Sequence, residues 1–232
     1  MAVQNSLAKQ GVNDKAVEYE CNGQTVKLTP NMIRNYLVSG GGNVSDQEVV
    51  MFLKLCQFQR LNPFLREAYL VKYGNSDATI VTGKEVFTKR ARRNANYAGQ
   101  QAGVVIQKEN GDIESRIGSL VLPSEVLVGG WAKVYIKGDE VPTEIFVSFD
   151  EYVGTKSNGE VNGQWKKKPA TMIRKVALVQ ALREAFPEEF QGMYSQEETG
   201  VDDSFISDIP IIDPAESIPQ APIPAQVLDP LA

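Results

Sequence analysis

The sequence predicts an α+β fold: a helical N-terminal lobe, then a mostly antiparallel β-sheet with packed helices. Apolar residues recur at the helical period between residues 30 and 60, short alternating segments follow up to residue 148, and a second helical stretch covers 168–186. The hydrophobic content of 42% is ordinary for a globular body. We place one domain at 24–190, preceded by a loose segment at 1–23 and followed by a disordered acidic, proline-rich tail at 191–232.

The N-terminal lobe is defined by two helix starts. A short strand is expected over Gln24–Leu28. Thr29 and Pro30 then provide an N-cap and a proline at the first helical position, and Gly40–Gly42 ends that helix. Ser45–Glu48 forms a capping box for a second helix that runs to about Arg60. The core stripe of this second helix is expected to be Val49, Phe52, Leu53 and Cys56.

The middle of the chain reads as strands separated by turns. Glu67–Tyr73 and Ala78–Thr82 flank Gly74–Asp77, which predicts a β-hairpin. A helix is expected from about Gly83 to Ala95, and a final helix over 168–186 is ended by Pro187. The further strands are expected at Val104–Gln107, Glu114–Leu122, Gly130–Ile136 and Thr143–Ser148.

Composition excludes several classes of chemistry. The chain has no histidine, which excludes Ser-His-Asp hydrolases and HExxH zinc proteases. Cys21 and Cys56 are the two cysteines, too few for a structural zinc site or a disulfide framework, so a reducing compartment is favoured. We find no apolar signal core and no apolar run near the ~20 residues that span a bilayer, and we expect a cytoplasmic protein without membrane contact.

No nucleotide or metal site is evident in the sequence. Thr82–Glu85 is the segment most similar to a Walker A loop, but Ala78 and Glu85 replace the required glycine and hydroxyl residue. An ATPase is therefore rejected, and no cofactor is expected, with Mg²⁺ entering at most in association with DNA. The acidic pairs Asp139-Glu140 and Asp150-Glu151 do not form a convergent set. A metal-dependent nuclease remains the weaker alternative.

Charge is unevenly distributed along the chain. The net charge is −5, but six of the 29 acidic residues and none of the 24 basic ones lie in 201–232, so the rest is nearly neutral. Lys84–Arg93 carries five basic residues and one acidic residue, and Lys156–Arg183 carries seven basic residues and one acidic residue. Because the local field decides whether phosphates are attracted, both segments are candidates for binding a polyanion. The acidic tail is a solubilising segment, a partner-docking peptide or a mimic of DNA.

The basic segments predict a groove for a nucleic-acid backbone. On one continuous helix, Lys167, Lys168, Thr171, Arg174 and Lys175 share an arc of about 120°. On the other segment, Lys89, Arg92 and Arg93 share a side. Trp165 is either a platform for base stacking or a core residue, and Arg183 is either a buried ion-pair partner or a contact to the groove. Without a base-reading motif, sequence-independent binding of single strands follows.

Two blocks resemble a known family. Val49–Phe64 ends in Leu61-Asn62-Pro63-Phe64 and is followed by Glu67-Ala68-Tyr69; the second block includes Gly163-Gln164-Trp165, Lys168-Pro169, Met172–Lys175, Gln180, Arg183 and Ala185-Phe186. In this order they resemble the RecT/Bet family of phage single-strand annealing proteins, closest to the Bet branch. The chain departs from that branch after Pro169, where Ala170-Thr171 replace a basic pair and Lys166–Lys168 could compensate.

The resemblance implies an ATP-independent recombinase without a catalytic site. Such proteins coat single-stranded DNA as rings or helical filaments and anneal it to a complementary strand. The implied partners are a phage 5′–3′ exonuclease and the single-strand-binding protein of a bacterial host, in whose cytoplasm the protein would act. A passive single-strand-binding protein with a partner-recruiting tail is the alternative. The candidate DNA-binding residues are Lys84, Lys89, Arg92, Arg93, Trp165, Lys166, Lys167, Lys168, Arg174, Lys175 and Arg183.

Overall fold

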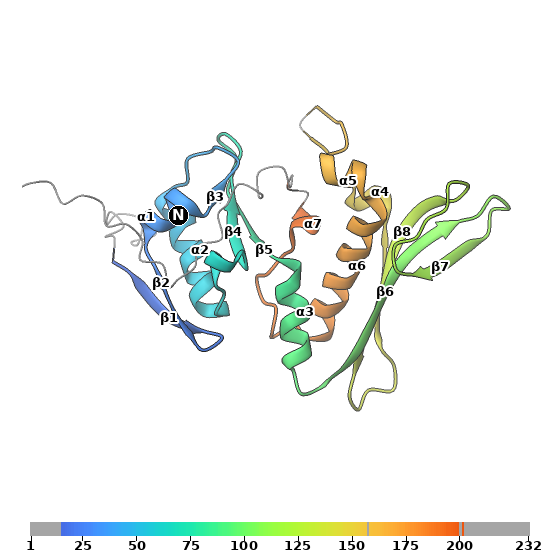
Figure 1. Ribbon diagram of the computed structural model, residues 1–232, viewed down its shortest axis with the longest axis horizontal. Helices are drawn as coiled ribbons and strands as arrows, with labels where there is room; N and C mark the ends of the chain where they lie inside the picture. Colours follow the sequence, from blue (N-terminus) through green and yellow to red (C-terminus); the bar gives the residue numbers. More distant parts are fainter. Residues whose placement is uncertain (1–14, 157, 200, 202–232) are drawn as a thin grey trace, which may run out of the picture.

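The computed structural model describes residues 15–156, 158–199 and 201 and confirms the α+β class. An N-terminal lobe, a central helical layer and a four-stranded sheet follow one another along the longest axis (Figure 1). The predictions for residues 1–14 and 202–232 lie outside the described residues. No helix of the described part has both the length and the apolar character needed to cross a membrane.

The N-terminal lobe opens with a β-hairpin. Strands β1 (Val17–Cys21) and β2 (Gln24–Leu28) pair antiparallel around Asn22 and Gly23, whose φ angles of 52° and 80° suit the tight turn that Asn-Gly favours. The prediction of β2 is confirmed. The prediction of a loose segment over 1–23 is wrong for residues 17–21, because these form β1, in which Val17, Tyr19 and Cys21 are half-buried or buried and the residues between them are exposed.

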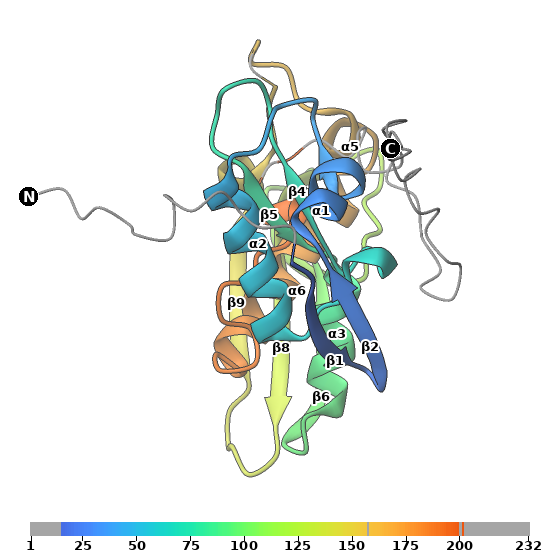
Figure 2. The same cartoon turned by 90° about the vertical axis from the view of Figure 1, so that its left-hand side faces the viewer.

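Two helices begin as their capping signals predict. In α1 (Pro30–Tyr36), the Thr29 hydroxyl accepts a hydrogen bond from the Met32 N–H at 3.2 Å. In α2 (Asp46–Gln59), Ser45 and Glu48 form the expected capping box. Helix α2 ends at Arg60, which adopts a left-handed conformation, and the short 3₁₀ helix η2 (Pro63–Leu65) follows. From the N-terminal side, α2 and the hairpin lie side by side (Figure 2).

A small sheet joins this lobe to the centre of the molecule. Strands β4 (Ala68–Val71) and β5 (Thr79–Thr82) form the predicted antiparallel hairpin. Strand β3 (Val38–Ser39), which we did not predict, adds in parallel to β4. Helix α3 (Lys84–Arg93) follows β5 and packs against α6 (Pro169–Ala185).

The larger sheet is antiparallel throughout and has the order β7-β6-β8-β9. Its strands are β6 (Tyr97–Gln107), β7 (Ile113–Ile117), β8 (Val126–Ile136) and β9 (Thr143–Ser148). The four strands were expected, but β6 and β8 are longer than predicted, and β7 ends at Ile117 rather than Leu122. The short helices α4 (Phe149–Tyr152) and α5 (Gly163–Lys167) come next.

Helix α6 (Pro169–Ala185) covers one face of this sheet and forms the centre of the core. It approaches β8 closely at Gly130, where a Cβ atom would lie only 2.6 Å from the Ile173 carbonyl oxygen. We predicted that a disordered tail begins at residue 191, and for residues 191–199 this prediction is wrong. Met193 and Ser195 are fully buried, and helix α7 (Gln196–Thr199) packs against α6 and β5. The folded body therefore continues to at least Thr199.

Candidate nucleic-acid interface

Three consecutive lysines form an exposed tip at one end of the central layer. Helix α5 is capped by Asn162, whose side-chain oxygen accepts the Trp165 N–H at 3.2 Å, and its last turn carries Lys166 and Lys167. Lys168 joins α5 to α6, and all three lysines are exposed. Within the described part of the chain, none of the three has a carboxylate within 4.0 Å. The lysine tip, Lys166–Lys168, thus presents three positive charges to solvent.

Trp165 belongs to the core and supports this tip. Its side chain is 1% exposed and meets Phe149 edge-on, with ring centroids 5.8 Å apart. A Cβ atom on Gly154 would lie 2.9 Å from the Trp165 ring, so the loop backbone also packs closely on it. The proposal that Trp165 stacks on a base is therefore corrected: the ring is not accessible, and it anchors α5 instead.

The predicted basic arc is interrupted at Lys168. This residue has φ −139° and ψ 51°, outside the helical range, because a following proline disfavours helical backbone. Helices α5 and α6 are therefore separate, and their cations do not share one helix face. Arg174 lies half-buried near the sheet, where its Nε–H donates to the Ala102 carbonyl of β6 at 3.2 Å.

Two further cations of α6 are paired with α7. Lys175 Nζ lies 2.7 Å from a carboxylate oxygen of Glu197, which is itself buried. The Arg183 guanidinium donates to both carboxylate oxygens of Glu198, at 3.1 and 2.7 Å, and its central carbon lies 4.8 Å from the Tyr194 ring centroid. Of the two interpretations of Arg183, the ion pair is the one that the structure shows.

Helix α7 was missed because its two glutamates were counted as part of an acidic tail. A local signal was available, since Ser195 and Glu198 have the spacing of a capping box. The Ser195 N–H indeed donates to Glu198 at 2.9 Å. The buried Phe190 and Met193 also mark this segment as folded.

The basic residues of α3 mostly hold neighbouring elements. Lys89 pairs with Glu67 at 3.1 Å, Arg93 donates to the side chain of Asn22, and Lys84 lies 4.0 Å from Glu85. Arg92 is exposed beside Tyr97, to which it hydrogen-bonds. Arg90, which was not among the candidates, binds the Gln59 side chain and backbone as well as the Glu189 carbonyl. These contacts fasten the hairpin and α2 to α3.

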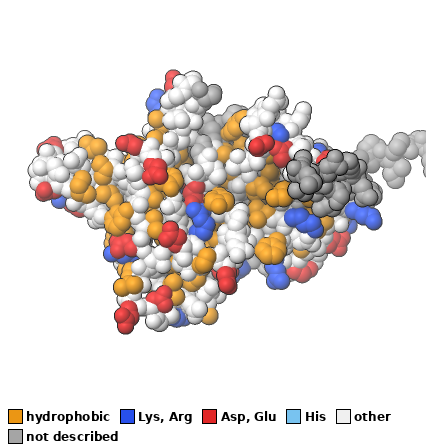
Figure 3. Space-filling model, turned by 180° about the vertical axis from the view of Figure 1, so that it is seen from behind, with side chains coloured by type: hydrophobic (Ala, Val, Ile, Leu, Met, Phe, Trp, Pro, Cys, Tyr) orange, Lys and Arg blue, Asp and Glu red, His pale blue; other side chains and the backbone are white. Residues whose placement is uncertain are grey.

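A cleft of about 610 Å³ lies beside these residues. Its wall includes the cations Arg60, Lys89, Arg90 and Arg93 together with the acids Glu67, Glu188 and Glu189. Figure 3 likewise shows positive and negative side chains interspersed over the rear face. The candidate cations therefore lie in three places. These are the lysine tip, the part of α6 that carries Arg174, Lys175 and Arg183, and helix α3. Of the candidate DNA-binding residues, Lys89 and Arg93 line this cleft.

The described residues contain no group of three or more Cys, Asp or Glu side chains placed to hold a metal ion. Their two cysteines are buried and free. Burial, aided by the nearby Glu67 carboxylate, raises the pKa of the Cys21 thiol to about 11. Both cysteines behave as core residues, as predicted for Cys56.

Comparison with known proteins identifies the family. The model of the RecT family matches residues 23–210, which is most of the chain and includes the whole candidate site. This chain belongs to the RecT family. The resemblance of its two sequence blocks to RecT/Bet proteins is thereby confirmed.

Two individual relatives were found for this RecT-family chain. It is 32% identical over 136 residues to the uncharacterized protein UU154 of Ureaplasma parvum serovar 3, covering 59% of this chain and 52% of the relative. It is 24% identical over 157 residues to the recombination protein bet of Escherichia phage lambda, and this match covers 68% of this chain and 53% of the relative. The chain thus matches about half the length of each relative.

The first RecT-like block builds the junction between α2 and β4. Leu61 is fully buried, and Asn62 caps η2 by accepting the Phe64 N–H at 3.1 Å. Glu67 accepts the Asn62 N–H at 2.8 Å and holds Lys89 of α3. This block therefore has a structural role, and the cations that could meet phosphate lie mostly in the second block.

Proposed function

We propose that this protein is an ATP-independent single-strand annealing protein that coats single-stranded DNA as an oligomer and promotes pairing of complementary strands in recombination. The observation that carries the proposal is the RecT family match over residues 23–210. The phage lambda relative, which is a recombination protein, supports the same biological role. A phage exonuclease, a host single-strand-binding protein and the bacterial cytoplasm are the proposed partners and location.

The lysine tip is the proposed primary contact with DNA. Annealing requires that phosphate repulsion between two strands be cancelled while the base edges stay free to pair. Lys166–Lys168 can meet phosphates without reading bases, and in the described structure they have no carboxylate partner to give up. Since one protomer offers only a short basic tip, we propose that neighbouring copies place their tips in a row along the strand.

The paired cations are proposed as secondary contacts. Lys175 and Arg183 would have to exchange Glu197 and Glu198 for phosphate, which has a cost because it leaves buried carboxylates without partners. The remaining cationic candidates, Lys84, Lys89, Arg92, Arg93 and Arg174, are proposed only as weaker contributors. Trp165 is withdrawn from the set because it is buried.

The proposal is tested by mixing complementary oligonucleotides with the full chain in the absence of ATP. We expect faster duplex formation than without protein. Slower duplex formation would identify a passive single-strand-binding protein instead. Loss of labelled DNA that depends on Mg²⁺ would identify a nuclease.

A further inference from the structure

Strand β7 has its apolar residues on the solvent side. Ile113 and Ile117 are 60% and 66% exposed. Their register partners show why: Arg116 pairs with the buried Val104, whereas Ile117 pairs with Gly103 on the opposite face of the sheet. A sheet with one solvated face normally carries polar residues on that face. The pattern in β7 is reversed, which indicates that its outer face is buried in a larger assembly.

The apolar surface continues across the sheet on the side away from α6. Phe146 of β9 is 59% exposed and pairs with Trp131 of β8, which in turn pairs with Gly103. Val126, at the start of β8, is also 59% exposed. We call this surface the outer sheet face; its exposed residues are Ile113, Ile117, Val126 and Phe146. A patch of this kind marks an interaction site in a soluble protein.

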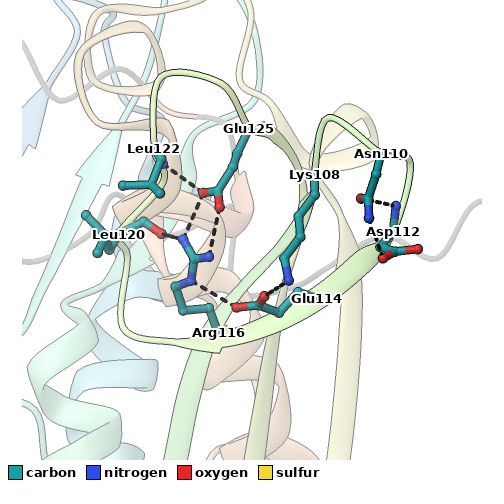
Figure 4. A network of polar contacts seen from close by, with 8 residues as sticks. All are labelled: Lys108, Asn110, Asp112, Glu114, Arg116, Leu120, Leu122 and Glu125. Carbon is teal, nitrogen blue, oxygen red and sulfur yellow. Dashed lines mark hydrogen bonds and ion pairs between the residues drawn. The ribbon is translucent and has the colours of Figure 1, made fainter.

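An ion-pair network on the opposite side of β7 holds this edge of the sheet in place (Figure 4). Arg116 donates to both oxygens of Glu125 at 2.8 Å, and its Nε lies 3.1 Å from Glu114. Glu125 also accepts the Leu122 N–H at 2.8 Å, which fixes the loop between β7 and β8. The edge of the outer sheet face is thus ordered before any partner arrives, and preorganisation lowers the entropic cost of binding.

A second apolar surface lies on helix α2 of the N-terminal lobe. Met51, Leu55 and Phe58 of α2 follow the i, i+4, i+7 spacing of one helix face. Met51 is 60% and Phe58 77% exposed, and the three residues line a shallow groove of about 700 Å³. We call this surface the α2 stripe.

We propose that the α2 stripe of one copy docks onto the outer sheet face of the next copy. This inference rests on the oligomeric coat of the proposed function and assigns its interface. A sheet buries an apolar face by covering it with a helix; α6 covers the inner face, and α2 of a neighbour supplies the helix for the outer one.

Charge at the two rims is complementary. Lys54 and Arg60 border the α2 stripe. Glu109 and Asp112 lie at the turn between β6 and β7, beside Ile113 of the outer sheet face. Glu144 of β9 is already paired with Lys133 of β8 at 3.0 Å and so adds no net charge to this face. Because the two surfaces differ, their contact is head-to-tail. Repetition of such a contact gives a ring or an open filament.

The interface is tested with Phe58→Glu on the α2 stripe and Ile117→Glu on the outer sheet face. Val141→Glu is the matched control, since Val141 is 75% exposed but lies on the turn between β8 and β9. The size of the full chain is measured by sedimentation velocity with and without a poly-dT oligonucleotide. Circular dichroism and thermal melting verify that each variant is folded.

A head-to-tail contact predicts a specific mixing result. The wild type and Val141→Glu should form assemblies larger than dimers. Phe58→Glu and Ile117→Glu should each be monomeric, because each has lost one of the two surfaces. Mixed in equal amounts they should form a 1:1 dimer, in which the intact α2 stripe of the Ile117→Glu chain docks onto the intact outer sheet face of the Phe58→Glu chain.

Other outcomes would overturn the interface. Dimers of either variant alone would show a symmetric contact of like surfaces. Monomers in the mixture, a monomeric wild type with and without oligonucleotide, or assemblies unaffected by both substitutions would exclude the contact. Annealing is measured separately: if assembly follows the prediction and the wild type does not anneal, the proposed function fails while the interface stands.

Discussion

Replacing the lysine tip by alanine should change the salt dependence of DNA binding more than it changes the fold. Each phosphate neutralised on a single strand contributes a slope of about −0.7 to log K against log salt. Four or five contacts per subunit give a wild-type slope of roughly −3, and removal of Lys166–Lys168 should leave about −1. Between 0.05 and 0.2 M salt, wild-type affinity should therefore fall about 60-fold and that of the triple variant only about 4-fold.

The assay is fluorescence anisotropy of a labelled poly-dT oligonucleotide titrated with full-length protein at several salt concentrations. Lys27→Ala is the control, since Lys27 is exposed on the hairpin and pairs with Glu18 at 3.2 Å. Unfolding in urea should be nearly unchanged in the triple variant, because none of the three lysines makes a described ion pair. A triple variant with the wild-type slope would refute the assignment of DNA contact to the tip.

Three further predictions concern stability and the end of the chain. Trp165→Ala should lower the free energy of unfolding in urea by about 3–5 kcal/mol, because it removes a buried aromatic ring; a change below about 1 kcal/mol would contradict its place in the core. Burial opposes ionisation of Glu48, but hydrogen bonds from Lys72, Ser45 and Ala78 outweigh it and lower its pKa to about 2. Its carboxylate therefore stabilises the fold above pH ~4.5, and this stabilisation is lost as pH falls toward 2. Denaturation of Glu48→Gln should show a deficit of about 2 kcal/mol at pH 7, after allowance for solvent screening, that disappears near pH 2; a deficit independent of pH would contradict this. Removal of residues 202–232 should preserve annealing of complementary oligonucleotides, since all candidate DNA-binding residues precede them, and loss of annealing would assign them an essential role.

Local signals explain what the sequence predicted correctly. The Thr29 cap and the Ser45–Glu48 capping box act within one helical turn, so both helix starts follow from neighbouring residues alone. Strand β1 carried such a signal too, in the alternation of Val17, Tyr19 and Cys21 before an Asn-Gly turn, and it was overlooked. By contrast, β3 has two residues and exists only by pairing with the distant β4, which no local pattern indicates.

The candidate site was predictable in charge but not in geometry. Exposure of Lys166–Lys168 follows from their charge, and the break at Lys168 was readable from Pro169. The partners of Lys175 and Arg183 were not, because they depend on how α7 folds back onto α6. Burial of Trp165 depends likewise on Phe149 and on the close approach of Gly154. These contacts are tertiary, and they decide which cations remain available for DNA.

The central claim is that this RecT-family protein pairs complementary single strands, and the rate of duplex formation without ATP tests it most directly. We predict that the wild type accelerates annealing of two oligonucleotides above the spontaneous rate, and that the alanine variant of the lysine tip largely loses this effect at moderate salt. A wild-type rate equal to or below the spontaneous one, over the whole range of protein-to-nucleotide ratios, would contradict the account.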